Sequence, residues 1–169
     1  MMDKSQTGRA GELAIELYAL VTSGGEVDIY APVVDDDHVD LVAGIRGGDP
    51  TLGIQVKTAP SVDRSGVVEA RASYPVGHVR DDNNFLYAVV LLDAVRIETM
   101  WLIRSPDFNR LAYHITESGR EIFEFRGRPS GDDAFEAFRI DPLQIGPAIL
   151  TAIQSSPHPP QWLAAIAGR

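Results

Sequence analysis

Apolar residues recur along the chain with two different periods, one typical of helices and one typical of strands. Between residues 8 and 21 they recur every three or four positions, which predicts a first helix. The apolar positions of this helix are Leu13, Leu17, Leu20 and Val21, with Ala10, Ala14 and Tyr18 beside them. Shorter apolar runs predict strands. These strands cover residues 27–30, 39–45, 51–58, 85–92 and 99–103. The run at 85–92 is almost wholly apolar, which is typical of a strand buried on both faces.

Turn residues and helix signals extend this pattern to the rest of the chain. Residues 46–50 contain two glycines and Asp-Pro, so we expect strands 39–45 and 51–58 to form a hairpin. Residues 59–84 are the hardest part to interpret, and the segment 67–70 fits either a strand or a helical turn. Ser105 and Pro106 fit the cap and the first position of a helix over 105–111. Further predictions are strands at 121–125 and 135–140, a helix at 143–153 and a short apolar helix at 162–167.

The order of these elements predicts a mixed α/β fold, with a central mixed sheet flanked by helices. At 169 residues we expect a single domain. The chain has no cysteine, which excludes disulfides and thiolate metal sites. Its start is polar and no apolar run is long enough to span a bilayer, so we expect a soluble cytoplasmic protein without a membrane partner. The net charge of −9 counts against a large nonspecific nucleic-acid surface but allows a local basic groove.

One lysine stands out chemically. Lys57 is one of only two lysines beside 13 arginines, and it lies inside a predicted strand. Lysine can release its proton in a protein, whereas arginine cannot. The preceding strand carries Asp40, and Gln55 lies two residues before Lys57, so both side chains of this strand point to one face of the sheet.

An antiparallel hairpin would bring these groups to a shared divalent cation. Asp40 offers a carboxylate, Gln55 an amide oxygen and Val56 its backbone carbonyl, and Mg2+ prefers such oxygen ligands. Lys57 could activate the attacking water or stabilise charge on a phosphate. Glu12, on the first helix, could hold the same metal through water.

These residues resemble the PD-(D/E)XK nuclease superfamily, which has the restriction-endonuclease-like fold. The resemblance rests on Glu12, on Asp40, on Gln55-Val56-Lys57 and on the order of the elements around them. It covers about residues 5–112, and we expect residues 113–169 to form an extension that packs on this core. Two positions depart from the family pattern: Gln55 replaces the usual acid, and His38-Val39 stands where a proline precedes the aspartate.

The resemblance implies an endonuclease that hydrolyses phosphodiester bonds in DNA with Mg2+ or Mn2+. Its catalytic residues would be Lys57, Asp40, Gln55 and Glu12, with Asp40, Gln55 and the Val56 carbonyl on the metal. RNA remains open as a substrate. A homodimer would suit the two-fold symmetry of a duplex.

Alternative interpretations stand beside this one. The chain could be an inactive domain of the same fold that acts as a binding or regulatory module, which the acidic composition and the neutral Gln55 favour. It could also be an unrelated interaction domain, in which Lys57 only protects an exposed sheet edge. Asp40 could instead cap a turn or pair with Arg46. His38, two residues from Asp40, could be a further ligand or a proton carrier.

Overall fold

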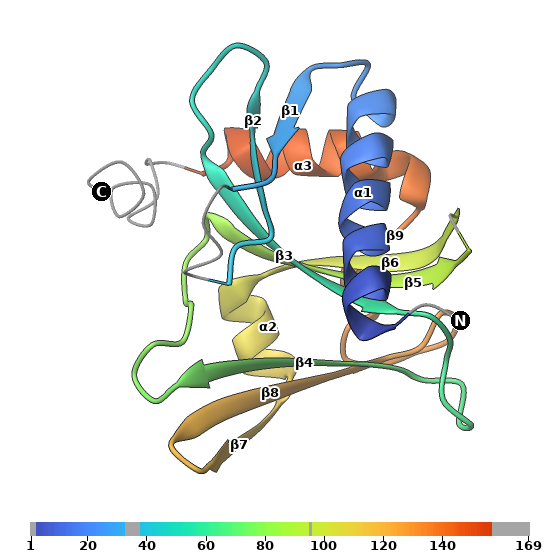
Figure 1. Cartoon of the computed structure of the whole chain (residues 1–169), viewed down its shortest axis with the longest axis vertical. Coiled ribbons are helices and arrows are strands. Elements are labelled where there is room, and N and C mark those ends of the chain that lie inside the picture. The colour runs from blue at the N-terminus through green and yellow to red at the C-terminus, as the bar shows by residue number, and fades with distance from the viewer. Residues whose placement is uncertain (1–2, 33–37, 95, 157–169) are drawn as a thin grey trace.

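Six strands form the mixed sheet at the centre of the molecule (Figure 1). The computed structural model describes residues 3–32, 38–94 and 96–156. Strands β3 and β5 are parallel, and the other neighbouring pairs of this sheet are antiparallel. The strands, in their order across the sheet, are β1 (Val27–Tyr30), β2 (Leu41–Ile45), β3 (Leu52–Ala59), β5 (Phe85–Asp93), β6 (Arg96–Arg104) and β9 (Arg139–Ile140).

Two helices, α1 (Lys4–Thr22) and α3 (Ile145–Gln154), cover one face of this sheet. Asp3 caps α1 through a reciprocal pair of bonds with Gln6, which satisfies two groups at the start of the helix. A 3-10 turn, η2 (Pro142–Gln144), precedes α3. The first apolar core lies between these helices and the sheet, so α1 is held directly over β3.

The opposite face of the sheet packs on helix α2 (Ser105–Leu111) and on a second, three-stranded sheet. The strands of this second sheet, in order, are β4 (Val68–Pro75), β8 (Arg120–Gly127) and β7 (Tyr113–Glu117). Aromatic residues dominate the second core, which includes Trp101, Phe108 and Phe125. The chain enters the second sheet between β3 and β5, so β4 brings its side chains over the face of the central sheet.

The expected mixed α/β fold is confirmed, and so is the antiparallel β2–β3 hairpin. Strand 27–30 has the expected bounds, and residues 85–92 form a strand in which every one of these residues is buried. The segment 67–70 belongs to a strand, β4, and not to a helical turn.

Other expectations were wrong. Residues 136–138 form a 3-10 turn, η1 (Glu136–Phe138), so only two residues of the expected strand 135–140 pair with the sheet. Arg104 is the cap residue of α2, because the Ser105 hydroxyl is buried and binds the backbone of Asp82 instead.

The expected helix at 162–167 lies outside the described residues. Across the described part of the chain, no helix has both the length and the apolar character needed to cross a bilayer.

Apart from Ile15, the buried face of α1 is formed by small residues. Thr7, Gly11, Ala14, Ile15 and Ala19 are buried, whereas the leucines that set the helical period are about half exposed. A side chain at Gly11 would overlap the hydroxyl of Thr58 on β3. Glycine at this position therefore lets the helix approach the strand directly beside Lys57.

Gly11→Ala is expected to destabilise the protein by about 1–3 kcal/mol, because the added methyl group forces α1 away from β3. The matched control is Gly8→Ala, one turn earlier, where an added methyl group meets no atom within 4 Å. That change should stabilise the helix by about 0.5–1 kcal/mol. Urea unfolding of both variants measures the difference, and equal effects at the two positions would contradict the close packing at Gly11.

Candidate metal and catalytic site

Asp40 lies at the point where β2 and β3 begin to pair. Leu41 is the first paired residue of β2 and stands opposite Ile54, so Asp40 falls beside Gln55. The backbone N–H of Asp40 donates to the Ile54 carbonyl at 3.0 Å, and its carboxylate Oδ2 accepts from the Val56 N–H at 2.6 Å. The side chain of Asp40 thus replaces a strand partner for β3 and is fixed against the Gln55–Val56 segment.

Gln55 is almost wholly buried, with 3% of its surface exposed. Its amide oxygen Oε1 accepts a hydrogen bond from the Tyr74 hydroxyl at 3.0 Å, and the Tyr74 hydroxyl lies 2.5 Å from that of Tyr87. Tyr87 stands opposite Gln55 on β5, and its ring stacks on Phe108 at 3.9 Å between centroids. Two buried phenols from two different sheets therefore meet at the amide of Gln55.

Both phenols are held in their neutral form. Burial raises the pKa of Tyr74 to about 12; the bond with Tyr87 and the charge of Arg80 lower it, and the carboxylate of Asp40 adds to the rise. Burial also raises the pKa of Tyr87 well above the usual tyrosine range, and the neighbouring Tyr74 adds to this. Each hydroxyl therefore keeps its proton and remains a hydrogen-bond donor at neutral pH.

Lys57 lies on the same face of β3 as Gln55 and is partly buried. β3 is flanked by β2 on one side and β5 on the other, so it is an interior strand of the sheet. The interpretation of Lys57 as a residue that protects a sheet edge is therefore wrong. The structure brings Asp40, Gln55 and Lys57 to one region, at the end of the β2–β3 pairing.

Glu12 lies on α1, next to Gly11 and therefore next to the contact with Thr58. Its carboxylate forms an ion pair with Arg9 at 2.7 Å, and 22% of its side chain is exposed. α1 covers the face of the sheet opposite to the one on which the Gln55 side chain meets Tyr74. The role of Glu12 at a metal stays a prediction.

Two further basic residues lie close to the tyrosine pair. His38 places its ring edge against Tyr74, with 5.1 Å between centroids, and its backbone is in the left-handed region at a φ of 57°. Arg80 stacks over Phe85, with its guanidinium carbon 5.6 Å from the ring centroid. The positive charge of Arg80 lowers the pKa of both phenols. This end of the sheet therefore combines the carboxylate of Asp40 with the basic residues His38 and Arg80.

Sequence reasoning missed Tyr74 and Tyr87 as parts of this region. One signal was available, because Tyr87 places a hydroxyl inside an otherwise apolar run, and a buried hydroxyl requires a partner. The identity of that partner depends on the parallel β3–β5 pairing and on the path of β4.

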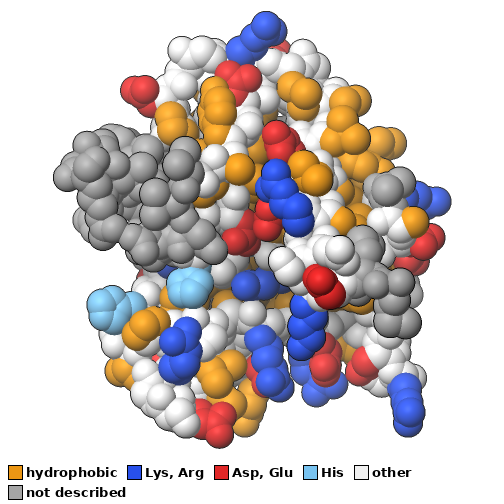
Figure 2. Space-filling view, viewed as in Figure 1, with side chains coloured by type: hydrophobic (Ala, Val, Ile, Leu, Met, Phe, Trp, Pro, Cys, Tyr) orange, Lys and Arg blue, Asp and Glu red, His pale blue; other side chains and the backbone are white. Residues whose placement is uncertain are grey.

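Basic side chains also gather over β4 and β8 on the face shown in Figure 2. Exposed arginines of these strands are paired with acids across the sheet: Arg71 with Glu124 at 2.6 Å, and Arg126 with Glu69 at 3.1 Å. This surface is therefore locally basic on an acidic protein, although part of its charge is balanced.

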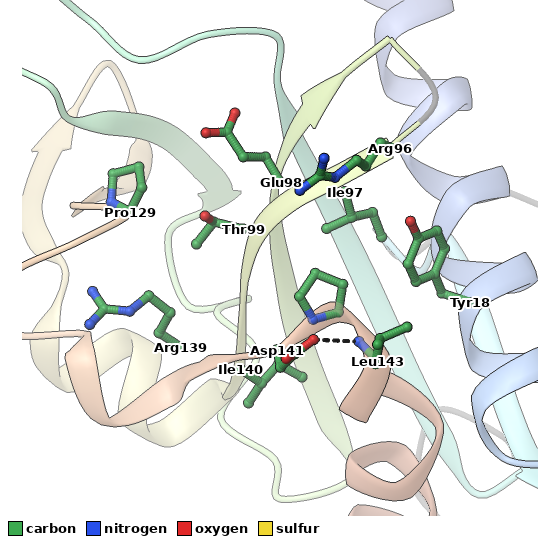
Figure 3. Close-up of a pocket in the computed structure, with 11 residues that line it drawn as sticks. Tyr18, Arg96, Ile97, Glu98, Thr99, Pro129, Arg139, Ile140, Asp141 and Leu143 are labelled. Carbon is green, nitrogen blue, oxygen red and sulfur yellow. Dashed lines mark hydrogen bonds between the residues drawn. The ribbon is translucent and has the colours of Figure 1, made fainter.

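A separate hollow lies between α1, β6 and the segment around β9 (Figure 3). Two of its charged groups hold the backbone: Asp141 accepts from the Leu143 N–H at 2.8 Å, and Arg139 donates to the carbonyls of Arg128 and Gly131. The hollow contains none of the residues predicted for catalysis.

Comparison with known proteins supports the fold. No family model and no curated protein matches the chain. Among solved structures, that of a bacterial homing endonuclease, I-Ssp6803I, matches with a TM-score of 0.61. The match covers 92% of this chain and 95% of that chain, at 14% sequence identity. The chain therefore shares the mixed α/β fold of a nuclease over nearly its whole length.

Proposed function

We propose that the chain is a metal-dependent endonuclease that hydrolyses phosphodiester bonds in DNA. The observation that carries this proposal is the contact of Asp40 with the Gln55–Val56 segment, two residues or fewer before Lys57 on β3, in a fold shared with a homing endonuclease. The order of these residues along the chain resembles the PD-(D/E)XK pattern, with Gln55 in place of the usual acid.

The donor atoms around Asp40 fit a hard divalent cation. A carboxylate has about four acceptor positions, so a bond from the Val56 N–H is compatible with a metal on the same group. The Val56 carbonyl points to the same side of β3 as its N–H, and therefore toward Asp40. Among the described residues, no group of three or more His, Asp or Glu side chains is placed to hold a metal ion. A Mg2+ or Mn2+ ion at Asp40 would need water and substrate phosphates as its other ligands.

Each residue has a distinct role in this proposal. Asp40, the Gln55 oxygen and the Val56 carbonyl would hold the cation, which would polarise the scissile phosphate and lower the pKa of a bound water. The Lys57 ammonium would orient or deprotonate the attacking water and balance charge on the phosphate. Glu12 would act from α1 through water, and Arg80 would supply positive charge for the DNA backbone.

Nicking of a supercoiled plasmid tests this function. We expect nicked and linear products with Mg2+ or Mn2+ and no product with EDTA. The double variant Asp40→Ala/Lys57→Ala, purified in the same way, controls for a contaminating nuclease. A labelled RNA of the same sequence distinguishes the two nucleic acids. Equal cleavage by the wild type and the double variant would discard the proposal.

A second candidate function is a catalytically inactive binding module on the same fold. The observation that favours it is Gln55, a neutral residue whose oxygen already accepts a bond from Tyr74. This candidate predicts binding of DNA or protein without cleavage in any divalent metal, so the plasmid assay separates the two.

A further inference from the structure

The Gln55 amide differs from the acid that it replaces in one respect that matters for a metal. A carboxylate presents two equivalent oxygens, so either can face a cation. An amide has one oxygen acceptor and one NH2 donor, and only the oxygen can bind a metal. A neutral residue at this position therefore works only if its surroundings fix which end faces the cation.

The structure provides such a constraint. Tyr74 has a single hydroxyl proton, with which it donates a hydrogen bond to the Gln55 oxygen at 3.0 Å. Its own oxygen is then available to accept from Tyr87, 2.5 Å away. Tyr74 and Tyr87 are 2% and 0% exposed, so water does not compete with this directed chain of hydrogen bonds.

The tyrosine pair is itself held from both sides. Tyr87 is fixed by its stacking on Phe108 and by its place on β5 opposite Gln55. Tyr74 is fixed by β4, which pairs with β8 along its whole length. The phenol that contacts Gln55 therefore has little freedom to reverse its orientation.

We propose that Tyr74, supported by Tyr87, is a positioning residue that presents the amide oxygen of Gln55 to the divalent cation. This inference rests on the proposed function, because it assigns a role at the same metal site. It would also explain how glutamine could replace the usual acid at this position. In a carboxylate either oxygen can face the cation, and for the amide the two tyrosines ensure that the oxygen does so.

A double-mutant cycle tests the proposal, with Mn2+ binding by calorimetry as a readout independent of cleavage. Tyr74→Phe keeps the ring and removes the hydroxyl. In the Gln55 background it should raise the Kd for Mn2+ about five- to tenfold, the effect of losing one hydrogen bond. In the Gln55→Glu background the same change should alter the Kd less than twofold, because a carboxylate needs no such orientation.

Two further variants complete the design. Tyr87→Phe leaves the Tyr74 hydroxyl in place and should have a smaller effect, about two- to threefold. Tyr18→Phe is the control, since this partly buried tyrosine packs against the opposite face of the sheet. Thermal melting of every variant separates a loss of stability from a loss of binding.

The outcomes are distinct. If Tyr74→Phe lowers the melting temperature but leaves the Kd unchanged, or changes it equally in both backgrounds, Tyr74 is only structural and the inference is overturned. If the wild type binds no Mn2+ at all, the inference and the metal-dependent function fail together. If the wild type binds Mn2+ but the variants do not show the expected difference in Kd, only the inference fails and the proposed function is unaffected.

Discussion

Asp40→Asn is expected to reduce metal-dependent DNA cleavage by about a thousandfold while the protein remains folded. Asparagine keeps an oxygen that can accept the Val56 N–H, so the junction of β2 and β3 is preserved. It removes the negative charge that attracts a hard cation. The loss of several kcal/mol of metal-based stabilisation corresponds to about three powers of ten in rate. The measurement is single-turnover nicking of a supercoiled plasmid in Mg2+.

The matched control for this change is Asp28→Asn. Asp28 lies on β1 of the same sheet and also accepts a backbone bond, from the Gly47 N–H at 3.2 Å. Asp28 thus contacts the turn at residues 46–50, at the opposite end of the β2–β3 hairpin from Asp40, so its replacement should leave the nicking rate within about twofold. Similar rates for the two variants would show that Asp40 does not hold the metal. A large drop in melting temperature for Asp40→Asn alone would assign it a structural role.

Lys57→Met should reduce the nicking rate by about 10²–10⁴-fold, the usual contribution of a positioned acid–base group. Methionine has a similar length and no charge, so it should keep the packing of the interior strand β3. Lys57→Arg separates two roles of the amine. Arginine keeps the positive charge but cannot release a proton, so it should restore little activity if Lys57 transfers a proton.

The only other lysine of the chain, Lys4, provides the control for Lys57. Lys4 is exposed at the start of α1, and Lys4→Met should leave the nicking rate unchanged. Full activity of Lys57→Met would remove the main chemical argument for an enzyme. Full activity of Lys57→Arg would assign the residue to charge stabilisation, with no role in proton transfer.

Local pattern was enough to predict the part of the fold that carries Asp40 and Lys57. The hairpin follows from two apolar runs around a Gly-rich turn, and its register then places Asp40 beside Gln55. The period of two along β3 places Gln55 and Lys57 on one face. These relations span few residues, so they can be deduced without knowledge of the complete topology.

The buried face of α1 could not be deduced in the same way. Hydrophobic periodicity selected Leu13, Leu17 and Leu20, which are about half exposed, because the larger apolar side chains dominate such a pattern. The helix instead packs through Ile15, Gly11 and Ala19, together with Ala14 from the predicted pattern, and the small size of the last three allows close approach to the sheet. The orientation of the helix depends on how closely it approaches the sheet, and a hydropathy pattern does not contain this distance.

The tyrosines at Gln55 depend on contacts between distant parts of the chain. Tyr87 meets Gln55 only because β3 and β5 are parallel neighbours, with β4 lying in a different sheet. β4 in turn is ordered by pairing with β8, which was predicted as a strand without a partner. The sequence therefore identified the residues that resemble a nuclease motif but not the tyrosines that meet at one of them.

The pairing of β4 with β8 also has a consequence during synthesis. β8 leaves the ribosome long after Asp40, Gln55 and Lys57, and until it pairs, β4 has no strand in its own sheet to hold Tyr74 in place. A chain that ends before residue 127 would contain Asp40, Gln55, Lys57 and Tyr74 but would lack a complete β8, the strand that pairs with β4 along its whole length. Tyr74 would then lose the pairing that holds it beside Gln55.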